Sequence, residues 1–159
     1  MKKRKKIIGI LGGMGPQASA RMVSLLVAIS AKKFKAVNCE DFPEIVLDSV
    51  PIPDFISSKR NKKIALEILS NRVKKLNKIG VSVLAISCNT AHLLLNQLQK
   101  VSKVPFISMV DEIAKEVHKS HIKKVGLLAS PTTFKSGLFQ QALARERLVW
   151  PERRVYVYY

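Results

Sequence analysis

The feature that most constrains the fold is a regular alternation of short apolar runs with longer segments whose apolar residues recur at helical spacing. The first run, residues 7–11, precedes a segment in which Met22, Leu25 and Ile29 would share one helix face. Strands are expected at 7–11, 44–49, 81–87, 106–109 and 125–129, and helices near 16–29, 61–79, 91–98, 113–117 and 134–145. Strands that alternate with helices indicate a parallel sheet flanked by helices, so we expect an α/β fold.

The composition agrees with a layered α/β core. Hydrophobic residues make up 47% of the 159-residue chain and aromatic residues only 6%, so the core should consist mainly of Ile, Leu, Val and Ala. This length suits one compact domain or one and a half small lobes. We expect a first lobe at residues 1–110 and an incomplete second lobe, with an atypical C-terminal tail, at residues 111–159.

The charge of the chain favours anionic partners. Lys and Arg number 28 against 11 Asp and Glu, a formal net charge of +17. The lysines are scattered, and no RNA-binding signature or interleaved aromatic pattern accompanies them, so no nucleic-acid partner is expected. The apolar run behind the basic start is too short for a secretory signal, and no stretch reaches the roughly 20 apolar residues of a membrane span. We expect a cytoplasmic protein without a membrane partner, whose two cysteines are free thiols.

A glycine-rich loop, Gly12-Gly13-Met14-Gly15-Pro16, follows the first expected strand. Its amides at a helix start could hold a carboxylate or a phosphate, or the loop could be a tight turn without a ligand. Residues 13–18 also match the dinucleotide pattern G-x-G-x-x-[GA], but dinucleotide-binding proteins with this pattern have an acidic residue about 20 positions further on. The first acid in a suitable place is Asp48, thirty residues after Ala18, so a Rossmann-like domain is the less favoured alternative.

A second polar cluster, Ser87-Cys88-Asn89-Thr90-Ala91-His92, follows the third expected strand. A cysteine at the carboxyl edge of a sheet and at the start of a helix is favoured as a thiolate, because helix amides stabilise negative sulfur. Thr90 could cap that helix, and Asn89 could bind a substrate carboxylate or amine. We expect His92 to pack or cap rather than act as a base, and no metal site is proposed.

Four ordered motifs resemble the cofactor-independent aspartate/glutamate racemase family over residues 7–151. They are Ile8-Gly9-Ile10-Leu11-Gly12-Gly13-Met14-Gly15-Pro16, Asp48-Ser49-Val50-Pro51-Ile52-Pro53-Asp54, Ser87-Cys88-Asn89-Thr90-Ala91-His92 and Leu127-Leu128-Ala129-Ser130-Pro131-Thr132-Thr133. The resemblance implies a two-lobed racemase of aspartate or glutamate, without pyridoxal phosphate or metal. Two cysteines would face each other across the substrate, one removing the α-proton and the other returning a proton to the opposite face.

The resemblance also implies a role for individual residues. Cys88 corresponds to the first-lobe cysteine, and Asn89 and Thr90 to the groups that hold the α-carboxylate or amine. Pocket-lining positions fall in the glycine loop and in the fourth motif. They are Met14, Gly15, Ser130, Thr132 and Thr133.

The chain departs from the family pattern at three points. The second cysteine is expected beyond Tyr159, and Cys39, which precedes the second strand, would lie at the opposite edge of the sheet from Cys88. Phe55 stands where some relatives have an arginine for the side-chain carboxylate. The ending, residues 152–159, does not resemble the family.

These departures leave more than one functional hypothesis. The first is an amino-terminal portion of a racemase that keeps one catalytic cysteine. A non-catalytic relic that binds a small anion or a partner chain is the alternative. An unpaired sheet edge and the apolar tail would favour self-association, for instance as a homodimer.

Overall fold

Four parallel strands form the sheet in the computed structural model, which describes residues 6–53, 58–122 and 125–146. They are β1 (Ile7–Gly12), β2 (Glu44–Ser49), β3 (Val83–Ile86) and β4 (Phe106–Ile107), in the order β2-β1-β3-β4. β1 lies in register with both neighbours, pairing Ile10 with Leu47 of β2 and with Ala85 of β3. The predicted α/β fold with a parallel sheet is confirmed.

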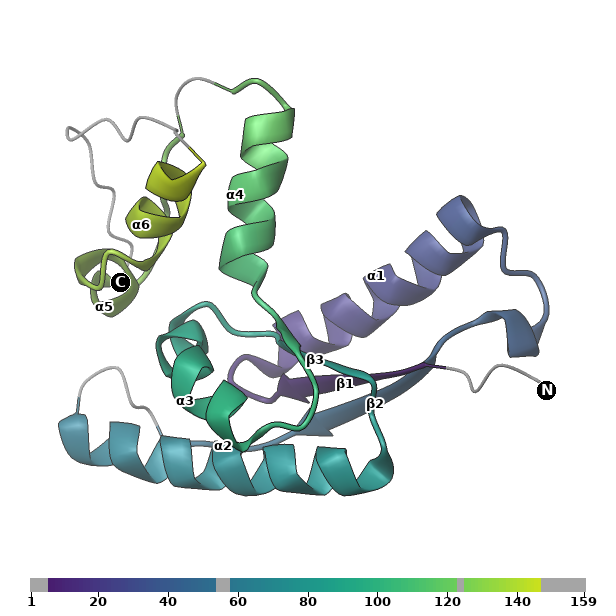
Figure 1. Cartoon of the computed structure of the whole chain (residues 1–159), viewed down its shortest axis with the longest axis horizontal. Helices are drawn as coiled ribbons and strands as arrows, with labels where there is room; N and C mark the ends of the chain where they lie inside the picture. Colours follow the sequence, from purple (N-terminus) through teal and green to yellow (C-terminus); the bar gives the residue numbers. More distant parts are fainter. Residues whose placement is uncertain (1–5, 54–57, 123–124, 147–159) are drawn as a thin grey trace.

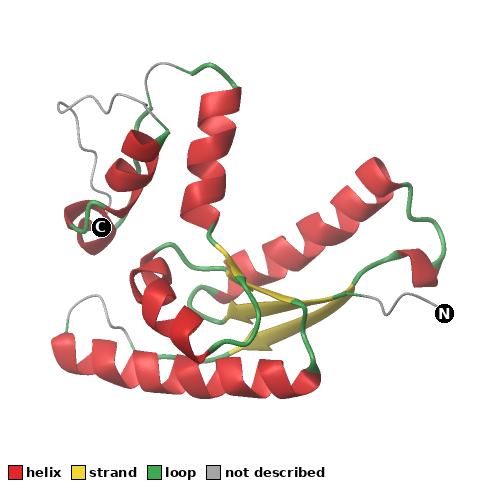
Figure 2. Cartoon of the chain, viewed as in Figure 1, coloured by secondary structure: helices red, strands yellow, loops and turns green. Residues whose placement is uncertain are grey.

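Helices cover the sheet from both sides (Figures 1 and 2). α1 (Pro16–Phe34) lies on one face and α2 (Lys59–Ile79) on the other, where α3 (Leu95–Val101) packs beside it. A short 3-10 helix, η1 (Cys39–Asp41), precedes β2, and another, η2 (Thr90–Leu94), precedes α3. The chain continues through α4 (Met109–Lys119), α5 (Pro131–Lys135) and α6 (Leu138–Arg145).

The main core lies between the sheet and α2. α2 buries Ala65, Leu69, Val73 and Leu76 at helical spacing, against the strand and α3 side chains of the same cluster. Ser58 begins the helix by accepting a hydrogen bond from the amide of Asn61, and Gly80 ends it with φ of 88°. The strand members of this cluster are Leu11, Leu84 and Ile86, and its α3-side members are Ala91, Leu94 and Leu98.

The order of the strands places a site between β1 and β3. From β1 the chain passes through α1 to β2 on one side, and α2 then carries it back across β1 to β3 on the other side. Successive connections therefore leave in opposite directions at β1 and β3. Parallel α/β sheets bind ligands outside the carboxyl ends of strands at this kind of switch point.

Two sequence predictions beyond α4 were wrong. The strand expected at 125–129 is not formed, and within the described residues Leu128 makes only an isolated bridge, with 68% of its surface exposed. A parallel strand needs a neighbouring strand for its hydrogen bonds, which a hydrophobic run does not guarantee. The helix expected at 134–145 is divided into α5 and α6 at Ser136-Gly137, where Gly137 has φ of 70°.

A second, smaller core joins α4 to α6. Val110 and Ala114 of α4 pack against Phe139, Ala142 and Leu143 of α6. An ion pair between Asp111 and Arg145 links the same two helices at the surface. The division into lobes at residue 110 stays a prediction.

α1 leaves several large apolar side chains exposed, namely Leu25, Val27, Ile29 and Phe34. The predicted self-association stays a prediction, and residues 152–159 of the expected tail lie outside the described residues. Among the described helices, no stretch combines the length and the apolar character needed to cross a bilayer.

Candidate active site

Two loops meet at the carboxyl ends of β1 and β3. The glycine loop follows β1, and the turn of residues 87–90, here called the cysteine turn, follows β3. Because β1 and β3 are paired from Ile8–Val83 to Leu11–Ile86, the two loops leave neighbouring strands at the same edge. The structure thus brings together two of the motifs that the sequence predicted to form the site.

The glycine loop needs glycine for steric reasons. Gly13 and Gly15 have φ of 89° and 118°, a region that side chains with a Cβ rarely adopt. A Cβ on Gly13 would lie 2.3 Å from the backbone nitrogen of Val50, the residue that follows β2. The same amide of Val50 donates a hydrogen bond to the carbonyl of Gly12, at 3.0 Å. The loop is therefore fixed against the end of β2.

A buried pair of serines joins the glycine loop to the cysteine turn. Ser19, in the first turn of α1, is 1% exposed, and its Oγ lies 2.8 Å from Oγ of Ser87. Ser19 Oγ also accepts a hydrogen bond from the amide of Gly13, at 3.0 Å. Ser19 was not predicted as a site residue, although a serine one helical turn after Gly15 is a signal for such a contact. The amide of Gly13 is engaged by Ser19, which for this amide favours the tight turn over the anion-binding alternative.

Cys88 is half-buried at the end of β3, where it packs against the main core, and Asn89 after it is exposed. The α-helix expected directly behind them is instead the five-residue η2, and α3 begins only at Leu95. The predicted α-helix start directly behind Cys88 is thus not formed, and a short 3-10 turn aligns fewer peptide dipoles than an α-helix. Thr90 does not cap a helix, which corrects a second expectation.

The hydroxyl of Thr90 instead contacts α5. Its Oγ1 lies 2.9 Å from Oγ1 of Thr133, and both side chains are buried. Ser130 caps α5, accepting a hydrogen bond from the amide of Thr133 and donating one to its Oγ1 at 3.0 Å. Thr132 is half-buried in the same turn. The fourth motif therefore lies beside the cysteine turn, and its predicted role in lining a substrate pocket stays a prediction.

We expect Thr133→Val to destabilise the fold by about 1–3 kcal/mol, because it leaves the buried hydroxyl of Thr90 without this partner. Urea denaturation of Thr90→Val, Thr133→Val and the double variant measures the coupling between them. The double variant should lose less free energy of unfolding than the sum of the single variants. Strict additivity would mean that the contact contributes no stability of its own.

His92 has both ring nitrogens engaged. Nδ1 lies 2.8 Å from the carbonyl oxygen of Cys88, and Nε2 accepts a hydrogen bond from the amide of Met109, at 3.1 Å. The side chain is 3% exposed. Burial lowers the pKa of His92, against smaller raising effects of the Cys88 carbonyl and of Asp111. This burial and these two hydrogen bonds are what we expect of a packing residue, and the absence of a base role for His92 stays a prediction.

The lowered pKa of His92 predicts a dependence of stability on pH. In the unfolded chain the pKa of His92 is near 6.5, and in the folded chain it is lower. Between these two pKa values the unfolded state therefore binds a proton that the folded state does not bind. The contribution of neutral His92 to the free energy of unfolding is therefore complete above pH 6.5 and is lost as the pH falls toward the lower pKa of the folded state. Urea midpoints measured from about pH 7.5 down to about pH 5 should fall more steeply for the parent chain than for His92→Gln. Parallel curves would contradict this prediction.

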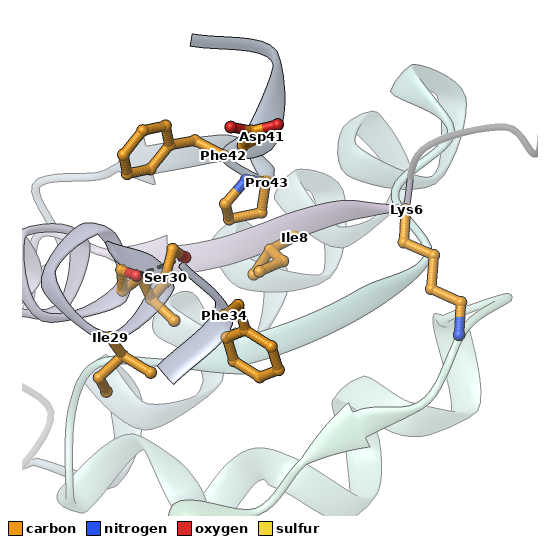
Figure 3. Close-up of a pocket in the computed structure, with 9 residues that line it drawn as sticks. Lys6, Ile8, Ile29, Ser30, Phe34, Asp41, Phe42 and Pro43 are labelled. Atoms are coloured by element: carbon orange, nitrogen blue, oxygen red, sulfur yellow. Dashed lines mark hydrogen bonds between the residues drawn. The ribbon is translucent and has the colours of Figure 1, made fainter. Parts of the chain in front are cut away.

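Other candidate sites lie away from the cysteine turn or are lacking. Cys39 is exposed in η1, at the amino end of β2. A pocket of about 420 Å³ opens between α1 and the amino ends of β1 and β2 (Figure 3), with walls that include Ile8, Leu26 and Phe34. Ile8 and Gly12 are separated by about 13 Å along β1, so the pocket belongs to the opposite edge. In the described part of the chain, no group of three or more His, Cys, Asp or Glu could hold a metal ion.

The dinucleotide alternative is not favoured by the geometry. Asp48, its candidate acidic residue, forms an ion pair with Arg72 of α2, at 3.7 Å. The amide of Gly13, which such a loop would turn toward a pyrophosphate, donates to Ser19 instead.

Comparison with known proteins agrees with the geometry of the site. The family model described as Asp/Glu/Hydantoin racemase matches residues 11–155. The chain belongs to this family. It is similar to the broad specificity amino-acid racemase RacX of Bacillus subtilis (strain 168), with 30% identity over 138 residues, which are 86% of this chain and 60% of RacX.

Solved structures show the same relationship. An aspartate racemase of Picrophilus torridus has a TM-score of 0.78 and 32% identity, and the match covers 92% of this chain and 63% of that one. An aspartate racemase homologue from Pyrococcus horikoshii OT3 has a TM-score of 0.76 and 28% identity, covering 92% and 65%. The racemase family member described here thus spans less than two thirds of the length of these relatives.

Proposed function

We propose that this chain provides one half of an amino-acid racemase site, with Cys88 as the group that moves the α-proton. The observation that carries the proposal is the position of Cys88 at the end of β3, beside the glycine loop at the switch point of the sheet. The chain's membership in a racemase family supports it. Aspartate and glutamate are the proposed substrates because the matching family model is described as Asp/Glu/Hydantoin racemase, and a formal charge of +17 suits anionic substrates.

The proposed chemistry needs one base on one face of the substrate. The Cys88 thiolate takes the proton from Cα of one enantiomer, leaving a carbanion and a neutral thiol. The thiol proton then exchanges with solvent, and the thiol returns a proton to the same face of the carbanion. Inversion would need a second acid on the opposite face. Exposed Asn89 and the half-buried Met14, Gly15 and Thr132 are the proposed substrate contacts, together with Ser130 and the buried Thr90 and Thr133.

The decisive experiment follows the Cα hydrogen in heavy water. L- and D-aspartate and L- and D-glutamate are incubated with the chain, and NMR records deuterium at Cα while chiral chromatography records inversion. Exchange of one enantiomer without inversion supports a single working base. Exchange with inversion supports a complete site in which another group supplies the second proton.

A lack of exchange with all four amino acids would overturn the proposed activity of the isolated chain. Aspartate binding without exchange, measured by titration calorimetry, would favour a non-catalytic relic that binds small anions. A titration with NAD checks the dinucleotide alternative in the same preparation.

A further inference from the structure

The ring of His92 connects two backbone groups that are far apart in sequence. One nitrogen contacts the carbonyl of Cys88 in the cysteine turn, and the other contacts the amide of Met109, the first residue of α4. The ring is buried between them, so water does not compete for either hydrogen bond. His92 therefore joins the turn that carries the thiol to the start of the helix that leaves the main sheet.

The chemistry of the two partners fixes the protonation of the ring. A backbone amide can only donate, so Nε2 of His92 must be the unprotonated acceptor of the Met109 hydrogen. The proton of the neutral ring is then on Nδ1, which donates it to the carbonyl of Cys88. A protonated ring would turn an N–H toward the N–H of Met109 and break the link. Only the neutral Nδ1–H form joins both elements.

The charged residue that acts on the ring lies at the start of α4. Asp111, in the first turn of α4, is the carboxylate that acts on His92, and it forms an ion pair with Arg145 of α6. Ser108 caps α4 by accepting a hydrogen bond from the amide of Asp111, at 3.2 Å. Cys88 contacts the ring through its backbone carbonyl, which carries no titratable group. The start of α4 is thus held by its own cap as well as by His92.

We propose that His92 is a positioning residue for Cys88, whose neutral Nδ1–H ring fixes the peptide plane after Cys88 and thereby the direction of the thiol. The carbonyl of Cys88 determines that plane, and the plane limits the orientation of the Cα–Cβ bond of Cys88 and of the Asn89 that follows. This proposal rests on the proposed function, because it takes Cys88 as the reacting group.

Two substitutions separate the two hydrogen bonds of the ring. The amide nitrogen of an asparagine reaches about as far as Nδ1 of histidine, so His92→Asn can keep the donor to Cys88 while losing the acceptor for Met109. A glutamine reaches about as far as Nε2, so His92→Gln can keep the acceptor for Met109 while losing the donor to Cys88. His121→Asn is the matched control, since His121 is exposed and has a φ of 54° that asparagine tolerates.

The measurement is the rate of alkylation of Cys88 by iodoacetamide in a Cys39→Ser background, where Cys88 is the remaining thiol. We expect His92→Gln to change this rate by about fivefold or more, because a small displacement of a reacting group has a large effect on rate. His92→Asn should stay within about twofold of the parent, as should His121→Asn. Equal rates in His92→Gln and His92→Asn would overturn the proposal.

Alkylation needs no substrate, so it separates this proposal from the proposed function. If the chain lacks exchange activity but the two His92 variants differ in alkylation, the proposed function fails and the positioning role stands. If exchange is present but the two His92 variants are alkylated at equal rates, the proposed function stands and the positioning role fails. ¹⁵N NMR of the unmodified chain provides a test independent of variant stability, since a ring protonated on Nε2 at neutral pH would also overturn the proposal.

Discussion

Replacing Cys88 with serine is expected to lower the rate of α-proton exchange by about 10²–10⁴-fold, the usual contribution of a positioned acid/base group. A serine hydroxyl has nearly the size of the thiol but ionises far less readily, so the basic form needed to remove the α-proton is almost absent. Cys88 is only half-buried at the edge of the main core, so replacing its thiol with a hydroxyl should disturb the packing little. The measurement is deuterium incorporation at Cα of aspartate and glutamate.

Cys39→Ser is the control for this loss. Cys39 lies in η1 at the other end of the sheet, so its replacement should leave the exchange rate unchanged within about twofold. An equal loss in the two variants would show that exchange does not come from the cysteine turn. Exchange that survives in Cys88→Ser would assign the base to another group.

The second large effect is expected from Gly13→Ala, which should destabilise the fold by about 3 kcal/mol or more. An alanine at this position is strained by the φ of 89°, and its Cβ would also lie 2.3 Å from the nitrogen and 2.5 Å from the oxygen of Val50. Backbone atoms cannot turn aside as a side chain does, so the end of β2 must move. The free energy of unfolding in urea is the measurement.

Alanine variants of two other glycines distinguish the cost of backbone strain from the cost of a steric clash. Gly15→Ala has φ of 118°, but its nearest contact is 3.9 Å from the new Cβ, so about 1–2 kcal/mol of conformational strain is expected. Gly126→Ala meets nothing within 4 Å and is not in the left-handed region, so its effect should be close to zero. A Gly13→Ala variant no less stable than Gly15→Ala would show that β2 shifts easily.

The sequence predicted the features that depend on local pattern. Apolar runs located β1, β2 and β3, and the predicted long helix 61–79 differs from α2 only at its first residues. Glycine and proline located the loop after β1 because the positive φ at Gly13 and Gly15 is a property of the residue type. The resemblance of the motifs to a family added the expectation that Ser130, Thr132 and Thr133 line the same pocket as the glycine loop.

What the sequence could not predict depends on contacts between distant segments. The hydrogen bonds of Ser19 with Ser87 and of Thr90 with Thr133 join residues 68 and 43 positions apart. A local pattern does not contain such pairings. The strand expected at 125–129 was wrong for the same reason, since a strand is stabilised by its neighbours as well as by its own residues.

The hydrogen bond that joins Thr90 of the cysteine turn to Thr133 also has a consequence for cooperativity. It crosses the predicted boundary at residue 110, so opening either side leaves a buried hydroxyl on the other side without this partner. We therefore expect the two regions to open as one cooperative unit, with similar protection of their amides from hydrogen exchange. The small core around Val110 and Phe139 should therefore resist local unfolding about as well as the sheet to which it is hydrogen bonded.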